Sequence, residues 1–230
     1  MDLNGIQKLT LLDYPGKVAC TVFLSGCDLR CPFCHNSELW GPNAPAVMDD
    51  LEFYAFLDKR RGMLEGVCIT GGEPTLRKEL YGFIKGIKER GYSVKLDSNG
   101  FRPEVLEGLI KDKLVDYIAM DIKNDPARYA VTSGLDRLDL APVYGSIKLL
   151  MESGVGYEFR TTVVKELHDT DSFVNIGRMI DGAERYYLQP FTDRDTVRFS
   201  GFHAPDADEM KTYLEAVKPH VKFAAIRGME

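Results

Sequence analysis

The chain carries the segment Gly26-Cys-Asp-Leu-Arg-Cys-Pro-Phe-Cys-His-Asn36 (GCDLRCPFCHN), in which three cysteines and a histidine lie close together. Three kinds of site fit these residues. Cys31-x-x-Cys34-His35 matches a covalent haem attachment sequence, and adding Cys27 gives a Cys₃His zinc site. In the third interpretation, three thiolates hold an iron–sulfur cluster and leave one iron without a protein ligand.

Cysteine number and compartment favour a metal site over a disulfide framework. The chain has five cysteines, an odd number, and three of them lie too close together to form a set of structural disulfides. Covalent haem is attached after export, but the N-terminus lacks the basic start and apolar core of a signal peptide. We therefore expect a cytoplasmic protein with a metal site in this segment.

Composition limits the partners. The chain has 230 residues, of which 44% are hydrophobic, and a formal net charge of -6. This length and apolar content suit a full hydrophobic core. The acidic balance argues against a nucleic-acid partner, and no apolar run reaches the length that a bilayer requires. We expect neither a nucleic-acid nor a membrane partner.

Apolar, β-rich runs alternate with segments of helical period. Leu80, Phe83, Ile84 and Ile87 fall on one helix face, and similar spacing recurs near residues 105–110, 147–150, 174–179 and 210–217. Such alternation predicts a parallel sheet with right-handed crossovers, either a partial barrel or a doubly wound sheet. The strand-like runs are residues 18–24, 66–70, 93–97, 115–121, 157–164 and 185–190.

Polar clusters follow most of these runs directly. In a βα barrel such strand ends meet on one face, whereas a flat sheet concentrates its site at one switch point. We therefore predict an α/β fold with a partial (β/α)₆ TIM-like barrel. We expect one domain over residues 1–230, with 1–17 as an N-terminal extension, 18–200 as the barrel core and 201–230 as a C-terminal helix and tail. The polar clusters are residues 25–27, 70–74, 97–100, 121–125 and 189–192.

The cysteine spacing carries a family resemblance. Cys27-x₃-Cys31-x₂-Cys34, together with Gly71-Gly-Glu-Pro74 at the next strand end, resembles the radical S-adenosylmethionine (SAM) enzymes. The resemblance implies a [4Fe–4S] cluster on the three cysteines, with SAM on the open iron. It also implies reductive cleavage of SAM to a 5′-deoxyadenosyl radical.

The resemblance assigns roles around the cluster. Gly71 and Gly72 allow the backbone close to the methionine amino group of SAM, because they lack a Cβ, and Glu73 accepts from that group. Phe33 packs on the adenine or shields the cluster. His35 is expected near the cofactor as a local hydrogen-bonding residue rather than a metal ligand. The remaining cysteines, Cys20 and Cys68, are expected in the core.

A narrower resemblance covers most of the chain. Gly5–Lys17, Cys34-His-Asn36, Asp97-Ser-Asn-Gly100, Asp121-Ile-Lys123 and Leu188-Gln-Pro-Phe191 look like the corresponding segments of glycyl-radical-enzyme activases. They resemble most closely the activating proteins of anaerobic ribonucleoside-triphosphate reductase. The implied partners are a glycyl radical enzyme and a reducing donor such as flavodoxin or ferredoxin.

The same resemblance extends the SAM site. It implies that Lys123 binds the SAM carboxylate and that Asp121 lies near the ribose. In the pyruvate formate-lyase branch, the aspartates matching Asp97 and Asp121 also help to hold a monovalent cation, so a cation is a further candidate cofactor. A buried pair of carboxylates bonded to loop amides is an equally good interpretation. Further implied contacts are Ser98, Asn99 and Gln189.

One departure from the activases leaves the nucleoside contact open, and a second function remains possible on the sequence alone. The pyruvate formate-lyase branch has a histidine that touches the nucleoside where this chain has Thr192. The alternative to an activase is a radical SAM enzyme acting on a small molecule, similar to 7-carboxy-7-deazaguanine synthase. An electron carrier or zinc module would not need the Asp121-Ile-Lys123 element.

Residues 124–134, rich in Pro, Gly and polar side chains, suggest a mobile loop beside a partner groove.

Overall fold

The computed structural model describes residues 1–229, which group into two compact units. Buried apolar side chains line both units, for example Phe53 and Ile84 in unit 1 and Leu150 and Tyr186 in unit 2. No helix within residues 1–229 combines the length and apolar character needed to cross a membrane. Unit 1 consists of residues 1–28, 38–98 and 102–118, and unit 2 of residues 29–37, 99–101 and 119 onward.

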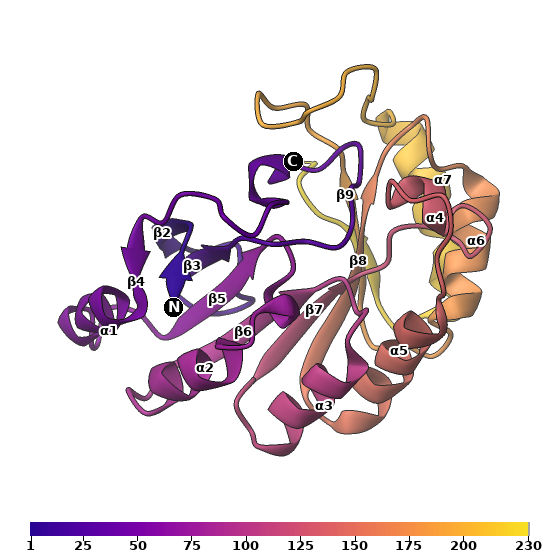
Figure 1. Ribbon diagram of the computed structural model, residues 1–230. Coiled ribbons are helices and arrows are strands. Elements are labelled where there is room, and N and C mark those ends of the chain that lie inside the picture. The colour runs from indigo at the N-terminus through magenta and orange to yellow at the C-terminus, as the bar shows by residue number, and fades with distance from the viewer. Residues whose placement is uncertain (230) are drawn as a thin grey trace. The chain divides into compact units, whose positions relative to one another are not determined.

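The sheet of unit 1 has the order β2 (Gly5–Thr10), β3 (Ala19–Leu24), β5 (Gly66–Gly71) and β6 (Ser93–Ser98) (Figure 1). The last three strands are parallel, and β2 pairs with β3 in the antiparallel sense. The carboxyl ends of β3, β5 and β6 therefore share one edge of the sheet. Two short strands form a separate antiparallel pair, β1 (Asp2–Leu3) and β4 (Met48–Asp49).

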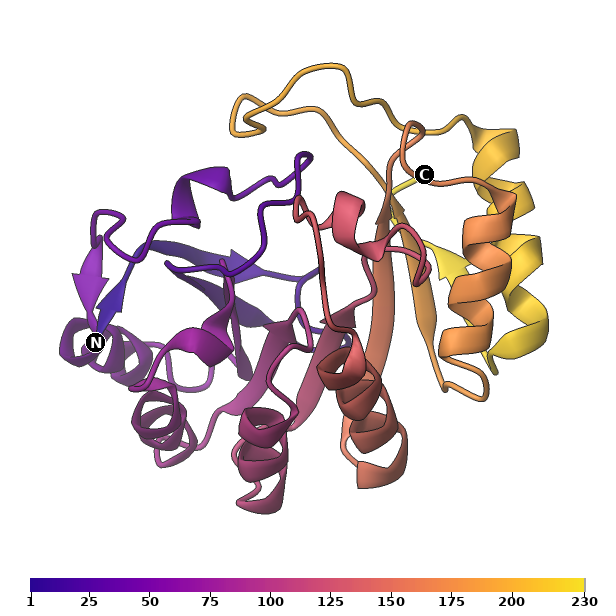
Figure 2. The same cartoon turned by 45° about the vertical axis from the view of Figure 1, so that its right-hand side comes forward.

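The helices of unit 1 follow its strands along the chain. A capping box begins α1, because the Glu52 amide donates to the Asp49 side chain at 2.8 Å and the Asp49 amide donates to Glu52 at 3.0 Å. Pro103 occupies the first turn of α3, a position that does not need an amide hydrogen. In Figure 2 α2 lies beside β6, which it contacts. The helices are α1 (Asp50–Lys59), α2 (Leu80–Lys88) and α3 (Pro103–Lys111).

The strands of unit 2 are also parallel. Strand β7 (Tyr117–Asp121) begins in unit 1 and ends in unit 2, where β8 (Gly156–Val163), β9 (Tyr186–Pro190) and β10 (Ala224–Ile226) follow in that order. The Ile122 amide donates to the Arg160 carbonyl at 2.9 Å just beyond the end of β7. Consequently the chain leaving β7 is held against the middle of β8.

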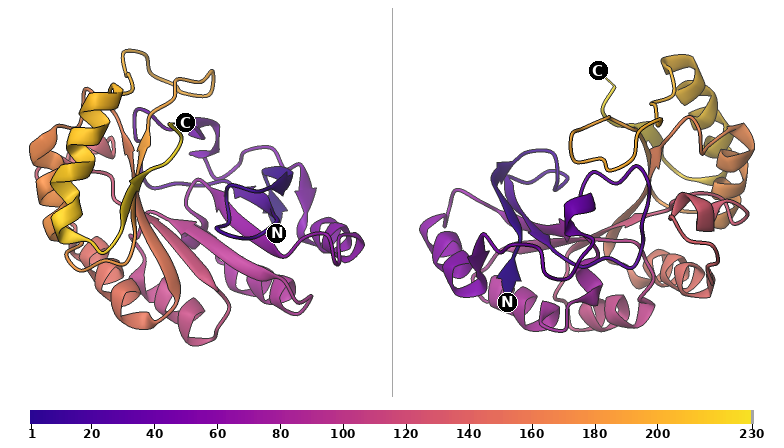
Figure 3. Two further views of the ribbon diagram at one scale, coloured as in Figure 1. Left: turned by 180° about the vertical axis from the view of Figure 1, so that it is seen from behind. Right: turned by 45° about the horizontal axis from the view of Figure 1, so that its top comes forward.

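The helices of unit 2 pack on one another and on this sheet. Two of them, α6 and α7, lie side by side (Figures 2 and 3), with Phe173 stacked on Tyr213 at a centroid distance of 4.7 Å. The left view of Figure 3 shows α7 running alongside β10. The helices are α4 (Tyr129–Thr132), α5 (Ala141–Ser153), α6 (Thr170–Met179) and α7 (Ala207–Val217), and short 3₁₀ turns are η1 (Ser37–Leu39), η2 (Pro74–Leu76) and η3 (Lys218–His220).

The elements predicted from periodicity are present with slightly shifted ends. They are the strands β3, β5, β6, β7, β8 and β9 and the helices α2, α3, α5, α6 and α7. The sequence did not indicate β1, β4 or α4, which are too short for a periodic signal. It also missed β2, β10 and α1. Helix α1 buries Phe53 and Leu57, which gives a weak apolar stripe.

Residues 124–134 are packed, and the prediction of a mobile loop is wrong. The buried Asn124 side chain donates to the Thr132 hydroxyl and to the Leu167 carbonyl, both at 2.9 Å. Tyr129 is fully buried in the short helix α4. The polar side chains that suggested a solvated loop instead bond to one another and to the unit 2 interior.

Candidate active site

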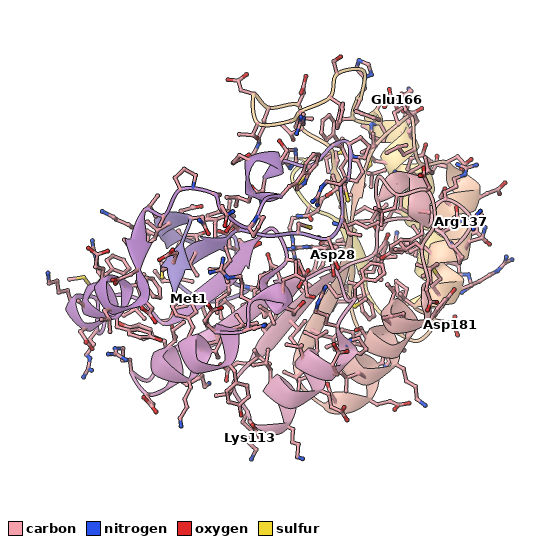
Figure 4. The ribbon with its side chains drawn as sticks, viewed as in Figure 1. Met1, Asp28, Lys113, Arg137, Glu166 and Asp181 are labelled. Carbon is pink, nitrogen blue, oxygen red and sulfur yellow. The ribbon has the colours of Figure 1, made fainter. Side chains whose placement is uncertain are left out.

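The first predicted cluster ligand, Cys27, follows β3 in unit 1 and is half-buried. Its amide donates to the Trp40 carbonyl at 3.1 Å. The next residue, Asp28, which Figure 4 labels, forms an ion pair with Arg102 at 2.8 Å. Backbone and side-chain contacts therefore hold the chain on both sides of the Cys27 thiol.

Gly71 and Gly72 pack directly on the segment that leads to Cys27. A Cβ at Gly71 would overlap the backbone of Leu24, and one at Gly72 would overlap the Gly26 carbonyl. Gly71 also has a φ of +124°, which a side chain disfavours. Gly26 in turn donates to the Leu39 carbonyl at 2.8 Å. Packing within the protein is thus sufficient to require both glycines, and their contact with the SAM amino group stays a prediction.

Glu73 connects the ends of β5 and β6. Its buried Oε1 accepts from the Thr75 amide at 3.1 Å, the Thr75 hydroxyl at 2.5 Å and the Ser98 hydroxyl at 3.0 Å. Its own amide donates to the Gly26 carbonyl at 2.7 Å. Glu73 therefore links three strand-end segments of unit 1, a structural role that the sequence did not indicate.

Asp97 is paired inside unit 1 with Lys95, a residue that the sequence did not single out. Lys95 is buried, and its ammonium donates to Asp97 Oδ1 and lies 3.7 Å from the Cys68 thiol. The Cys68 thiol lies 3.9 Å from Asp97 Oδ1, so it faces a charged pair as well as the apolar core. Cys20 is fully buried, and burial raises the pKa of its thiol to about 12, as expected for a core residue.

The other two predicted ligands lie in unit 2. Cys31 is buried and Cys34 half-buried, and the Cys34 amide donates to the Cys31 carbonyl at 3.0 Å in a tight turn. Burial raises the pKa of the Cys31 thiol to about 11, although the Lys123 ammonium opposes this shift. The Arg30 amide donates to the Ser133 carbonyl at 2.9 Å, so the packed segment 124–134 supports the chain just before Cys31.

Asp121 and Lys123 form a network with Arg160 of β8. Asp121 Oδ1 accepts from Arg160 Nε at 2.5 Å, and its Oδ2 accepts from Lys123 Nζ at 2.9 Å. Burial would raise the pKa of Asp121, but the two cations outweigh it and hold the pKa far below its usual range. Burial likewise would lower the pKa of Lys123, and Asp121 instead raises it. Both groups are therefore charged at neutral pH.

His35 packs against the segment that follows β9. Its Nε2 lies 2.6 Å from the Thr192 carbonyl, and its ring stacks on Phe191 with an interplanar angle of 4°. Burial lowers the pKa of His35. Phe33, two residues before His35 in the chain, is also buried. The predicted contacts of His35 and Phe33 with SAM stay predictions, and Thr192 uses its carbonyl to hold His35.

The remaining predicted SAM contacts, Asn99 and Gln189, lie in unit 2. Asn99 is buried, and its Oδ1 accepts from the Phe101 amide at 3.1 Å, which shapes the turn after β6. Gln189 is half-buried in β9, opposite Thr162 of β8. Neither position contradicts a ligand contact, and both assignments stay predictions.

A buried histidine supports Lys123 from behind. His168 Nε2 lies 2.9 Å from the Lys123 carbonyl, and the Val164 amide donates to His168 Nδ1 at 3.1 Å. Nδ1 also lies 3.1 Å from the Val164 carbonyl, whereas Nε2 faces the Lys123 carbonyl, which can only accept, so a hydrogen on Nε2 makes this bond. Burial lowers the pKa of His168, which keeps the ring neutral.

The cysteines have the donor chemistry of an iron–sulfur site. Cys27, Cys31 and Cys34 are free thiols, and thiolates are the usual ligands of these clusters. Within residues 1–229, no group of three or more His, Cys, Asp or Glu side chains surrounds a single metal-ion position. A cluster takes each thiolate on a different iron, so its ligands need not meet at one point.

Comparison with known proteins identifies the family. The model of the radical SAM superfamily matches residues 21–175, which include all three predicted cluster ligands. A Methanocaldococcus jannaschii protein named as a glycyl-radical enzyme activating enzyme is 30% identical, over 98% of this chain and 95% of its own length. The pyruvate formate-lyase-activating enzyme of Clostridium pasteurianum is 29% identical, over 82% of this chain and 81% of its own length.

Solved structures agree on the fold. SuiB of Streptococcus suis bound to its precursor peptide SuiA has a TM-score of 0.69 and 16% identity. That match covers 90% of this chain and 48% of SuiB, so the chain spans about half of it. QueE from Escherichia coli has a TM-score of 0.58 and 13% identity, covering 99% and 94% of the two chains.

These likenesses confirm the predicted α/β fold, a partial (β/α)₆ TIM-like barrel of the radical SAM type. They also give the cofactors, because this family uses a [4Fe–4S] cluster and SAM. The assignment of the cluster to Cys27, Cys31 and Cys34 stays a prediction. The chain belongs to the radical SAM superfamily and, within it, to the glycyl-radical-enzyme activases.

Proposed function

We propose that this enzyme places a radical on a glycine of a partner glycyl radical enzyme, and that the partner is an anaerobic ribonucleoside-triphosphate reductase. The similarity to a protein named as a glycyl-radical enzyme activating enzyme carries the proposal, because it extends over 98% of this chain and 95% of that one. The narrower choice of partner rests on the Gly5–Lys17 and Leu188–Phe191 segments.

Cys27, Cys31 and Cys34 would hold the cluster. When bound, the [4Fe–4S] cluster and SAM supply the reductive cleavage that gives a 5′-deoxyadenosyl radical. The protein's contribution is to hold the thiols and exclude water. Cys31 is buried, and the nearby Lys123 ammonium favours its thiolate form, which is the form that binds iron.

Lys123 would bind the SAM carboxylate, with Asp121 near the ribose. Arg160 is important here, because it satisfies one oxygen of Asp121 while Lys123 contacts the other. Lys123 has three donor hydrogens, so it can keep Asp121 and still donate to a ligand carboxylate. Asp121 would thereby orient the Lys123 ammonium and leave some of its donor hydrogens for the ligand.

Further residues would complete the SAM site. Glu73 fixes the loop that would approach the amino group, through its bonds with Thr75 and Ser98. The further proposed contacts are Phe33, His35, Gly71, Gly72, Asp97, Ser98, Asn99 and Gln189.

The cellular setting follows from this chemistry. We propose that residues 1–230 work as one radical SAM domain in the cytoplasm, where the five free thiols stay reduced. A low-potential donor such as flavodoxin or ferredoxin would reduce the cluster.

The test is a glycyl radical measurement. The chain is reconstituted anaerobically with iron and sulfide, reduced and mixed with SAM and anaerobic ribonucleotide reductase or pyruvate formate-lyase. Electron paramagnetic resonance should detect an α-glycyl radical on the reductase, and it should vanish when the target glycine is changed to alanine. Cys31→Ala should abolish the signal, whereas the core variant Cys20→Ala should keep it.

Other outcomes have definite meanings. A radical on pyruvate formate-lyase alone would reject the proposed partner but keep the activase. Silence with every glycyl radical enzyme, together with SAM consumption on a small molecule, would reject the activase in favour of a small-molecule enzyme.

A further inference from the structure

Lys95 lies in the interior of β6, where lysine is unusual. The residue is 1% exposed, and its neighbours along the strand, Val94 and Leu96, are fully buried. Lys95 and Asp97 are two residues apart, so their side chains project from the same face of β6. Cys68 of β5 stands directly opposite Lys95 in the register of the parallel pair. Strand geometry alone therefore brings the three polar side chains together.

The pair is an internal neutralisation of charge. The Lys95 ammonium bonds to Asp97 Oδ1, and the side chains are 2% and 13% exposed. An ionised group so far from water is tolerated only when it is paired, and removing one partner leaves the other uncompensated. The Cys68 thiol, 3.7 Å from Nζ, supplies a third polar neighbour. Lys95 therefore fixes the Asp97 carboxylate and places the opposite charge beside it.

We infer that Lys95 is a built-in counter-cation for Asp97, so that this enzyme needs no monovalent metal ion at that carboxylate. The inference rests on the proposed function, which places Asp97 at the SAM site. It disagrees with the cation that the pyruvate formate-lyase resemblance implies at Asp97. The ammonium of Lys95 already occupies an oxygen that such an ion would bind. Lys95 is a positioning residue, because it acts through Asp97.

The first test needs no variant. SAM cleavage to 5′-deoxyadenosine is measured at constant ionic strength in potassium chloride and in tetramethylammonium chloride, whose cation is too large for a carboxylate site. The wild-type rate should differ by less than about twofold, because the counter-charge is covalent. Strong stimulation by potassium would overturn the inference.

The second test creates the missing dependence. Lys95→Met keeps the length of the side chain and removes its charge. In tetramethylammonium chloride this variant should cleave SAM about tenfold more slowly than wild type, with recovery in potassium or ammonium chloride. Lys95→Met/Asp97→Asn, which removes both charges, should show no response to cation identity. Lys95→Met that matches wild type in both salts would overturn the inference.

Thermal unfolding separates this inference from the proposed function. In tetramethylammonium chloride, Lys95→Met should lower Tm by roughly 10 °C, and potassium should restore part of the loss. The matched control is Lys88→Met, which removes a more exposed ion pair with Asp116 in the same unit. Its Tm should not depend on the cation. If wild type cleaves no SAM in any salt, the proposed function fails, while the Tm comparison still tests Lys95. If the Tm of Lys95→Met were the same in potassium chloride and tetramethylammonium chloride, the inference would be overturned.

Discussion

Two strands of this protein carry the same pair of charges in opposite order. Strand β6 contains Lys95-Leu-Asp97, whereas β7 ends at Asp121 and is followed by Ile122 and Lys123. In each pair one apolar residue separates the lysine from the aspartate, and the two charged side chains bond to each other. In β6 the lysine comes first and lies inside the strand, whereas in β7 the lysine comes last and lies beyond the strand end.

This order decides what each lysine can do. The Lys95 side chain is 2% exposed and bonds to Asp97, so its charge compensates that carboxylate. The Lys123 side chain is 17% exposed, and Asp121 has Arg160 as a second cation. Lys123 therefore keeps donor capacity for a ligand. The comparison assigns Lys95 to holding Asp97 and leaves Lys123 available for the ligand contact in the proposed function.

The largest effect should come from breaking the buried pair. Lys95→Met should reduce the free energy of unfolding by about 3–5 kcal/mol, because it leaves the half-buried Asp97 carboxylate without its counter-charge. Lys123→Met should cost less than about 1 kcal/mol, since Arg160 still neutralises Asp121. Urea unfolding of both variants measures the contrast. Equal losses would show that position relative to the strand end does not matter.

The next largest effect is expected on SAM binding, where the substitution of Lys123 should matter. Lys123→Ala should weaken SAM binding by roughly 1.5–3 kcal/mol, as a lost charge-assisted contact does. Equilibrium dialysis with the reconstituted enzyme gives this value. Lys148→Ala, on the exposed face of α5, is the matched control and should bind SAM normally. Unchanged affinity in Lys123→Ala would assign Lys123 to the fold alone.

A third experiment asks what holds the cysteine turn beside the Asp121–Lys123 pair. Gly134 and Gly154 have φ values of 70° and 75°, but a Cβ at Gly134 would overlap the Arg30 backbone, while nothing lies within 4 Å of one at Gly154. Both alanine variants share a backbone cost of about 1–2 kcal/mol. Gly134→Ala should in addition lower the iron and sulfide content. Equal iron and sulfide content in the two variants would show that the packing of segment 124–134 does not support cluster binding.

The smallest effect concerns the support of Lys123 by His168. Burial lowers the pKa of His168, with Asp125 and Arg128 as opposing nearby charges. The unfolded histidine, with a pKa of about 6.5, then takes up a proton that the folded one refuses, so stability is full above pH 6.5 and falls below it.

His168→Gln keeps a donor and does not titrate. Wild type should lose stability faster than this variant between pH 7 and 5, by at most about 1.4 kcal/mol per pH unit, the limit for one proton. Urea unfolding across this range provides the measurement. Parallel pH profiles would rule out His168 as the titrating group.

Much of the architecture could be predicted from the sequence, because buried strands and amphipathic helices follow apolar periodicity. The cysteine segment and the polar strand ends also indicated the chemistry. Arg160 and Lys95 could not be assigned, since their partners depend on which strands are neighbours and in which register. A charged residue inside an apolar strand was nevertheless a visible signal for Lys95. Segment 124–134 was misjudged because polar composition does not distinguish internal bonding from solvation.

The fixing of Gly26 has a thermodynamic consequence for cluster uptake. Its amide donates to the Leu39 carbonyl and its carbonyl accepts from the Glu73 amide, so hydrogen bonds within the protein fix the residue before Cys27. Ordering one backbone residue costs about 1–2 kcal/mol of conformational entropy. Under the proposed function, that cost falls on folding rather than on ligation, because the backbone before the first thiol is already ordered. Iron affinity at Cys27 should therefore depend on strand packing several residues away from any sulfur atom.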